Sequence, residues 1–337
     1  MSKALTARQT QAPRRHRNQS ESGSRESQSA HGIRPGSEYN PIGDGKIAPQ
    51  STTAPKGPKN KAHGVSRGLV TRPEPAPKGR KKFRPPAAQE IQIIPVPIEA
   101  EVQPGDSLPR LLLDALKHQK QRLHRGDILV IKHKIVSKAE GQFVDLQKII
   151  PSASSRRWAR SYDLDARVIE LAIAQSRRIV RRKRGVLITE TRHGLICANS
   201  AIDVSNVDGG RHAVLLPEDP DHSAAKIHAA LKKTVHLSVP VIISDTFGRP
   251  WREGLTEVAI GVAGMKALHD YRGERDPHHY ELQASVEADA DQLACAAGLV
   301  CGKLARTPAC IIRGFAYRPG RGTARDLLRP AANDLFR

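Results

Sequence analysis

The chain has 337 residues and a formal net charge of +21, with 55 Lys and Arg against 34 Asp and Glu. It contains no apolar run approaching the ~18 residues of a membrane span and no N-terminal apolar stretch of ~7–15 residues, so we expect neither a membrane protein nor a secretory signal. The charge excess is the global feature that points to a partner, because strongly basic chains are typical of nucleic-acid binders.

The basic charge is concentrated at the N-terminus. Residues 1–90 carry 18 Lys or Arg and 6 Asp or Glu, a net charge of +12, together with 11 of the 24 prolines. A segment this polar and proline-rich buries too little apolar surface to offset the entropy lost on ordering, which predicts disorder. The remaining 247 residues carry a net charge of +9 and are long enough for a large core. The expected organisation is a disordered basic extension, 1–90, followed by one folded domain, 91–337.

The apolar patterns of the folded domain predict strands and helices in an irregular order. We expect strands at 91–94 (ended by Pro95), 128–131, 185–189, 239–244 and 309–312. We expect helices at 108–116, 167–180, 223–236 and 293–304, the second of them ending in the basic run 181–184. The order lacks a strict βαβ rhythm and shows no internal repeat, which indicates a mixed arrangement of strands and helices.

The four cysteines give a further indication of the chain's environment. Cys197, Cys295, Cys301 and Cys310 show no CxxC spacing and stand in apolar stretches. This pattern predicts buried, reduced thiols in a cytoplasmic protein, and neither zinc nor disulfides are expected.

The first candidate site is the stretch 137–141, which follows an apolar run. We expect Ser137 to start a helix, where its free backbone N–H groups together with Lys138 could hold a phosphate. The alternative is an ordinary capped helix with a solvated lysine.

The second candidate is the polar, turn-rich stretch 199–207. Asp203 and Asn206 offer a carboxylate and an amide three residues apart, which suits a hard cation or a ribose. The alternative is a structural turn stabilised by Asp or Asn side chains.

The third candidate is the stretch 244–254, which we expect to be a loop after the strand at 239–244. Asp245 stands at the carboxyl end of that strand, where α/β sheets place ligand groups. Together with Thr246, Arg249 and Arg252 it could bind a cation and an anion, and we favour this function over a salt-bridged turn.

Other catalytic patterns are absent from the sequence. The neighbours His278 and His279 point apart on any regular element and have no third ligand at zinc spacing, so a surface loop is the better interpretation. The chain has no GxxxxGK[ST] phosphate loop, no GxGxxG after a strand and no GxSxG elbow.

Taken together, these stretches resemble the coenzyme F420-0:L-glutamate ligase family. The matching blocks occur in the family's order over about 91–337, at 126–141, 187–194, 203–207, 244–252, 258–264 and 324–336. The resemblance implies an α+β fold with mixed sheets and a homodimer. It also implies a ligase that uses GTP and Mg²⁺ or Mn²⁺, with K⁺ as a further candidate ion, to join F420-0 to L-glutamate through an acyl phosphate.

The resemblance also implies roles for individual residues. Asp203, Asp245 and Lys138 match catalytic positions, and the metal ligands are Asp203, Asp245, Thr246 and Gln283. Nucleotide contacts fall on Glu99, Ala100, Glu101, Val102, His133, Lys138 and Asn206. Arg249 and Arg252 receive no role from the family, and we hypothesise that one of them grips a carboxylate or phosphate of the acceptors. Four stretches depart from the family. Ile98-Glu99-Ala100 replaces a Gly- and Pro-containing turn, His133 replaces a small polar residue, and the stretches 276–280 and 289–292 differ from the usual patterns.

Two alternative functions remain open at this point. A member of the family could ligate an amino acid to a different phosphorylated acid. In a different class, the protein could bind nucleic acid through its basic extension, although Tyr39 and Phe83 are the only aromatic residues there for base stacking.

Overall fold

The computed structural model describes residues 90–204 and 210–334. Residues 1–89 of the predicted extension lie outside this range, as does Asn206. The helices are α1 Leu108–His118, α2 His133–Ala139, α3 Ala153–Tyr162, α4 Ala166–Ala174, α5 Pro220–Val235 and α6 Asp289–Gly298, with short 3-10 turns η1 Leu146–Lys148, η2 Asn199–Ala201, η4 Ala324–Leu327 and η5 Ala331–Asn333. The strands are β1 Gln92–Val96, β2 Ile128–Lys132, β3 Phe143–Asp145, β4 Ser176–Lys183, β5 Val186–Thr191, β6 Ile196–Ala198, β7 His212–Val214, β8 Val241–Arg249, β9 Arg252–Ala263, β10 His269–Asp270, β11 Val286–Glu287 and β12 Ala309–Arg313.

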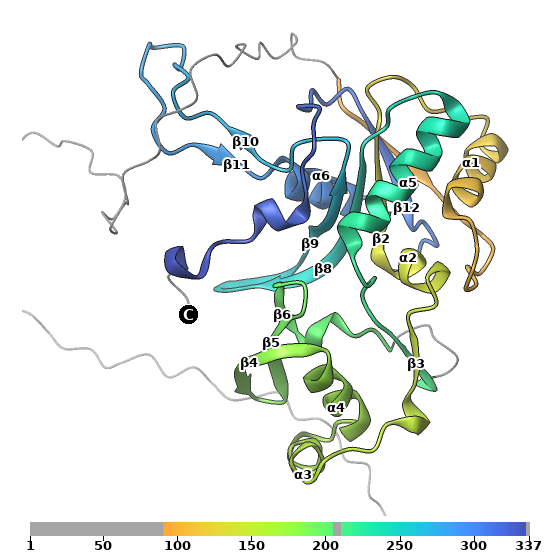
Figure 1. The fold of residues 1–337 in the computed structure, drawn as a ribbon, viewed down its shortest axis with the longest axis vertical. Coiled ribbons are helices and arrows are strands. Elements are labelled where there is room, and N and C mark those ends of the chain that lie inside the picture. Colours follow the sequence, from red (N-terminus) through yellow and green to blue (C-terminus); the bar gives the residue numbers. More distant parts are fainter. Residues whose placement is uncertain (1–89, 205–209, 335–337) are drawn as a thin grey trace, which may run out of the picture. The chain divides into compact units, whose positions relative to one another are not determined.

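A five-stranded sheet with the order β1-β12-β2-β8-β9 forms the centre of the fold. Only β2 and β8 run parallel, and the other neighbours are antiparallel. Helices α1 and α5 cover one face and α6 covers the other (Figure 1). Strand β2 shows why both faces are covered: Leu129 and Ile131 pack toward α1 and α5, whereas Ile128 and Val130 pack toward α6. The α+β prediction with mixed sheets is confirmed.

Three small sheets accompany the central one. Strands β4, β5 and β6 form an antiparallel sheet on which α4 packs, with α3 against α4. Strands β3 and β7 pair, as do β10 and β11. The apolar contacts of α3 and α4 with β5 form a core cluster of their own, which includes Ala159, Ile169 and Leu187.

The structure confirms most of the predicted elements, but Pro95 does not end the first strand. Pro95 lies inside β1 and is in register with Cys310 of β12. Because β1 is an edge strand, it needs hydrogen bonds on one side only and tolerates a residue without an N–H.

The predicted helix at 167–180 is wrong in its second half. Helix α4 ends at Ala174, and β4 begins at Ser176 and pairs with β5. Ile179 and Val180 are β-branched, and cross-strand pairing outweighs their weak helix propensity. The basic run 181–184 therefore belongs to a strand and its turn instead of a helix C-terminus.

Two smaller predictions also need correction. The helix expected at 293–304 is α6, Asp289–Gly298, and Leu304 beyond it is 95% exposed. All four cysteines are free, but Cys295 is exposed, whereas Cys197, Cys301 and Cys310 are buried as predicted. Cys295 is not among the buried residues of α6, but its thiol donates a hydrogen bond to the carbonyl of Glu257 in β9 at 3.1 Å, so it lies beside the sheet.

The start of α5 packs against strand β9 at one edge of the central sheet. A Cβ atom at Gly261 would lie 2.3 Å from the carbonyl oxygen of Pro220, so only glycine permits this approach of β9 to α5. One carboxylate oxygen of Asp221, Oδ1, accepts hydrogen bonds from the backbone N–H of Val262 at 2.9 Å and of Ala324 at 2.7 Å. These bonds connect α5, β9 and the C-terminal segment. None of the described helices is long and apolar enough to cross a membrane.

The start of α6 carries an acid whose ionisation opposes folding. Burial, with a smaller contribution from Glu287, raises the pKa of Asp289 to about 6. Because this value lies above that of the unfolded chain, the native state binds the extra proton. The contribution of Asp289 to stability is present below pH ~4 and is lost as the pH rises through about 6.

We therefore expect Asp289→Asn to increase stability relative to the wild type as the pH rises from 4 to 7. His269 lies 3.6 Å from Asp289, and its pKa is lowered mainly by burial, so its own contribution to stability grows as the pH rises. Because both proteins contain His269, the prediction concerns the difference in the free energy of unfolding between variant and wild type. Urea denaturation at several pH values measures it. Parallel curves for the two proteins would contradict the prediction.

Candidate functional site

The end of β2 and the short helix α2 bring four basic side chains to four carboxylates. These pairs are Lys132 with Glu257, His133 with Asp245, Lys134 with Asp203 and Lys138 with Glu101. The Nε2 atom of His133 lies 3.2 Å from Oδ1 of Asp245, and Nζ of Lys134 lies 2.6 Å from Oδ2 of Asp203. Segments distant in sequence therefore meet at the carboxyl end of β2, where open sheets bind ligands.

Helix α2 follows β2 without a loop, and Lys132 is its N-cap residue. Ile135 and Val136 continue the buried pattern of β2 into the helix, which explains why the helix starts so early. Ser137 consequently lies in the last turn, so the prediction that it begins a helix is wrong. Its buried hydroxyl lies 3.5 Å from Nδ1 of His133, where it orients the ring that faces Asp245.

Asp245 lies in the middle of β8, not in a loop. Strand β8 continues to Arg249 and forms a hairpin with β9, so the expected loop at 244–254 is replaced by two paired strands and a tight turn. At that turn Trp251 has a positive φ of 57° and is 80% exposed. A carboxylate on a paired strand is held more firmly than one on a loop.

The side chains next to Asp245 point to the opposite face of the sheet. The hydroxyl groups of Ser244 and Thr246 donate hydrogen bonds to Glu257, at 3.1 and 2.8 Å. Their alternation with Asp245 is the ordinary period of a strand. The structure thus places the Thr246 hydroxyl beside Glu257 and the Asp245 carboxylate beside His133.

Glu257 was missed by the sequence reasoning. It is buried, and it joins Lys132, Ser244 and Thr246 under the strand that carries Asp245. A signal was present in the sequence, because Glu257 stands two residues before the buried Ala259 and so occupies an inward position of β9. An acid at such a position needs a partner.

Asp203 follows a run of unusual backbone conformation. Asn199, Ser200 and Ala201 have positive φ values of 49°, 54° and 56°. Ser200 holds this run in place, since its N–H donates to Oγ1 of Thr189 at 2.9 Å and its hydroxyl donates to the carbonyl of Ala172 at 2.7 Å. Backbone this costly is concentrated at functional sites, where the surrounding structure maintains it.

Two backbone hydrogen bonds with Val214 then fix Asp203 itself, at 3.0 and 2.8 Å. The N–H and C=O groups of Asp203 are therefore both fixed, and they hold the backbone from which its carboxylate extends to Lys134.

A thiol near Asp245 has no nucleophilic character. Burial, assisted by the negative charge of Asp245, raises the pKa of Cys197 to about 12. Cys197 therefore stays protonated at neutral pH, and it does not supply a thiolate for covalent catalysis.

The remaining predicted residues lie around this centre to different degrees. Among the nucleotide candidates, Glu101 pairs with Lys138, Val102 is buried, and Glu99 and Ala100 are exposed between β1 and α1. In the hairpin, Arg249 donates to the carbonyl of Glu253 at 3.2 Å, and Arg252 is exposed. Gln283 is exposed between β10 and β11, and its predicted role stays a prediction.

A family model described as F420-0:Gamma-glutamyl ligase matches residues 98–314. The chain belongs to this family. It is 41% identical to the coenzyme F420:L-glutamate ligase of Methanopyrus kandleri over 252 residues, which are 73% of this chain and 98% of that protein. It is 44% identical to the protein of the same name from Methanothermobacter thermautotrophicus over 236 residues, 69% of this chain and 93% of that one. As a member of the family the protein is a ligase that forms carbon–nitrogen bonds.

The carboxylates of this ligase suit a hard divalent cation in chemical type. Asp203 and Asp245 offer oxygen donors of the kind that Mg²⁺ and Mn²⁺ prefer. Within the described residues, no three His, Cys, Asp or Glu side chains form a metal-binding group. The oxygen donors of Asp203 and Asp245 fit Mg²⁺ or Mn²⁺ in chemical type, and in this structure each carboxylate is paired with a basic side chain of α2.

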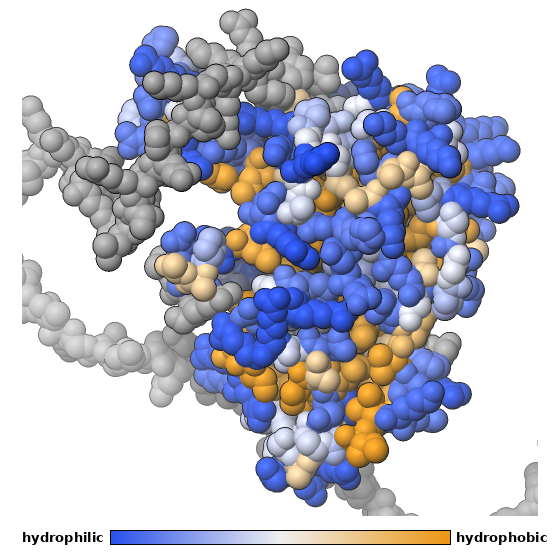
Figure 2. Space-filling model, viewed as in Figure 1, coloured by the Kyte–Doolittle hydropathy of each residue, from blue (hydrophilic) through white to orange (hydrophobic). Residues whose placement is uncertain are grey.

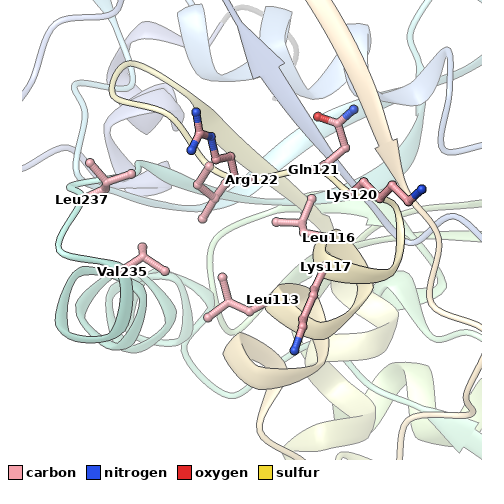
Figure 3. Close-up of a pocket in the computed structure, with 9 residues that line it drawn as sticks. Leu113, Leu116, Lys117, Lys120, Gln121, Arg122, Val235 and Leu237 are labelled. Atoms are coloured by element: carbon pink, nitrogen blue, oxygen red, sulfur yellow. The ribbon is translucent and has the colours of Figure 1, made fainter.

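A separate pocket of this ligase lies at the opposite end of the same strands. Figure 3 shows it between the C-terminal ends of α1 and α5, with a volume of about 390 Å³. Its lining is apolar at Leu113, Leu116 and Leu237 and basic at Lys117 and Lys120. Leu123 and Leu237 precede β2 and β8, whereas the paired carboxylates gather where β2 ends, so this pocket is not part of the candidate site.

Proposed function

We propose that this protein joins L-glutamate to the carboxylate of coenzyme F420-0 in an amide bond, with GTP and a divalent cation. The observation that carries the proposal is the convergence of α2 side chains on carboxylates from distant segments, in a chain whose relatives are named for this ligation.

The reaction we propose has two steps. The terminal phosphoryl group of GTP passes to a carboxylate oxygen of F420-0, which gives an acyl phosphate and GDP. The amine of L-glutamate then attacks the acyl carbon, the phosphate leaves with the bonding electron pair, and the nitrogen loses a proton. Such transfers depend on positioning and on neutralising charge, which lysines close to the phosphates provide.

In this proposal Lys134 and Lys138 leave their carboxylate partners and bind phosphate oxygens of the nucleotide. His133, Asn206 and the turn 99–102 make the other nucleotide contacts. Asp203 and Asp245 hold one divalent cation. Thr246, whose hydroxyl lies beside Glu257 on the other face of β8, is a ligand of a second metal ion, and Gln283 is a further metal contact. The cation would offset negative charge on the phosphates and on the acyl oxygen. A cytoplasmic homodimer is the working state that we propose.

The direct test is incubation of the full-length protein with F420-0, L-glutamate, GTP and Mn²⁺, followed by mass spectrometry. We expect a product heavier than F420-0 by one glutamyl residue, together with GDP and phosphate. The absence of such a product, combined with glutamate-dependent GTP turnover on another phosphorylated acid, would replace F420-0 as the acceptor.

The exposed Arg252 gives a prediction about acceptor binding. We expect Arg252→Ala to lower kcat/KM for one acceptor by roughly tenfold or more through a higher KM, because a hydrogen bond to a charged group contributes about 1.5–3 kcal/mol. Arg272→Ala is the control, since Arg272 is bound to Asp270 outside the hairpin. Steady-state kinetics with each acceptor varied in turn would measure the effect. Unchanged Michaelis constants for both acceptors would contradict the role.

A further inference from the structure

The positive charge of the folded part is gathered on one small region. Residues 153–184, from α3 to the end of β4, contain ten Lys or Arg and three Asp or Glu, a net charge of +7. Residues 91–337 as a whole carry only +9. We call the exposed cations of this region the α3–β4 face, which comprises Arg156, Arg157, Arg160, Arg177, Arg178, Arg181, Arg182, Lys183 and Arg184.

Helix α3 contacts the edge strand β4 at Arg182 and at the turn that follows β4. The guanidinium carbon of Arg182 lies 5.2 Å from the centre of the Trp158 ring. At the turn after β4, a Cβ atom added to Gly185 would lie 3.2 Å from Cβ of Tyr162, so this turn packs on the end of α3. Figure 2 shows strongly hydrophilic side chains in a band at the level of the three-stranded sheet.

Most of the few acids nearby already have partners, whereas Asp163 is exposed. Glu190 pairs with Arg178 at 2.8 Å, and Asp165 pairs with Arg167 at 2.6 Å. Glu170 accepts hydrogen bonds from the hydroxyl groups of Ser152 and Ser155. Apart from Arg178, the cations of the α3–β4 face make no ion pair with any residue of the described ranges.

The register of β4 arranges some of these cations in a row. Two irregularities in the pairing with β5 leave Arg178, Arg181 and Lys183 opposite Glu190, Ile188 and Val186. Because these partners alternate along β5, the three cations share the face of the sheet that is turned away from Leu187 and from α3, whereas Arg182 lies on the α3 side. Since β4 is the edge strand of its sheet, cations of both of its faces border the same sheet edge. Cations on the same face of a strand stand ~7 Å apart, a spacing comparable to that between successive phosphates of a nucleic-acid strand.

This concentration of charge opposes folding unless an anion binds. On α3, Arg156 and Arg160 are four residues apart, where like charges repel. Nine of the ten cations in 153–184 are arginines, whose planar fork matches phosphate oxygens in two hydrogen bonds. A polymer of phosphates would neutralise the whole row at once.

We propose that the α3–β4 face binds the phosphate backbone of nucleic acid, independently of base sequence. Trp158 is half-buried and covered by Arg182, and Tyr162, which is 43% exposed, packs against the Trp158 ring, so the face has little free aromatic surface for stacking on bases. Exposed apolar side chains beside it, Leu164 and Val186, keep more than half of their surface covered and do not protrude as a membrane anchor requires. Charge alone therefore determines the affinity.

The test measures binding of the full-length protein to a fluorescein-labelled, mixed-sequence 20-mer of single-stranded DNA between 50 and 300 mM salt. The face variant is Arg156→Gln, Arg160→Gln, Arg181→Gln and Lys183→Gln combined. The matched control is Lys117→Gln, Lys120→Gln, Lys232→Gln and Lys233→Gln, which removes the same charge from exposed positions of α1, α5 and the segment after α1.

We expect the face variant to bind at least about tenfold more weakly than the wild type. The slope of log K against log salt should become shallower by about 3, because each phosphate that the protein no longer neutralises reduces the slope by ~0.7. The control should bind like the wild type, and both should retain ligase activity.

Three results would overturn the proposal. Equal affinities for both variants and the wild type would place any binding on the N-terminal extension. Equal, face-dependent affinity for poly-L-glutamate of the same length would show that the face binds carboxylates as well as phosphates. Stronger face-dependent binding to phosphatidylserine vesicles would identify a membrane surface instead.

Discussion

Replacing Asp245 by Asn should reduce glutamate-dependent GTP turnover by roughly 10²-fold or more while leaving the fold intact. Asn has the same shape and keeps the oxygen that accepts the backbone N–H of Thr246 at 2.7 Å, so β8 retains its local hydrogen bond. It removes the negative charge that faces His133 and that we propose holds the cation. The loss should therefore be seen in kcat more than in stability.

The control for Asp245→Asn is Asp114→Asn. Asp114 is an exposed acid of α1 that pairs with Arg110 on the helix surface, away from the site. It makes the same chemical change without touching β8, so we expect its turnover to equal that of the wild type. Titration of both variants with Mn²⁺, followed by calorimetry, separates lost metal binding from lost chemistry. Wild-type turnover in Asp245→Asn would remove Asp245 from the proposed metal site.

The strands that frame the site could be predicted from sequence because their apolar runs are unbroken. Strand β2 and the first half of β8 are buried on two faces, so periodicity and bounding turns located them to within a few residues. The carboxyl end of such a strand is a general place for ligand groups, which is why Asp245 stood out before its surroundings were known.

The sequence alone could not predict which residues pair with the side chains of the site. The pairing of Lys134 with Asp203 joins residues about 70 positions apart, and no local pattern encodes that contact. The continuation of β8 to Arg249 was missed because Gly248 and Pro250 are turn formers, and only the register with β9 extends the strand through Gly248. Likewise, β4 owes its form to β5, not to its own sequence.

The ion pair of Lys132 with Glu257 should have the largest effect on stability. The two side chains are 19% and 8% exposed, so neither charge is well solvated alone. Ser244 and Thr246 donate to different oxygens of Glu257, so Glu257→Gln keeps the acceptor of one hydroxyl and gives the other an NH2 donor. It also leaves the ammonium of Lys132 without its counter-charge. Breaking a buried pair in this way costs about 3–5 kcal/mol. Urea denaturation, with the midpoint and slope both fitted, measures the loss in the free energy of unfolding.

The double variant Lys132→Met with Glu257→Gln separates the pair from the residues around it. With both charges removed, the buried site is neutral. One of the two hydroxyl groups keeps its acceptor and the other can accept from the amide NH2, so most of the lost stability should return. Asp114→Asn, which breaks the exposed pair with Arg110, should change stability by no more than about 0.5 kcal/mol. If the double variant were as unstable as Glu257→Gln, the contribution of Glu257 would lie in its hydrogen bonds. Restored stability without restored turnover would show instead that the charge of the pair, on the face of β8 opposite to the Asp245 side chain, is retained for the site and not for the fold.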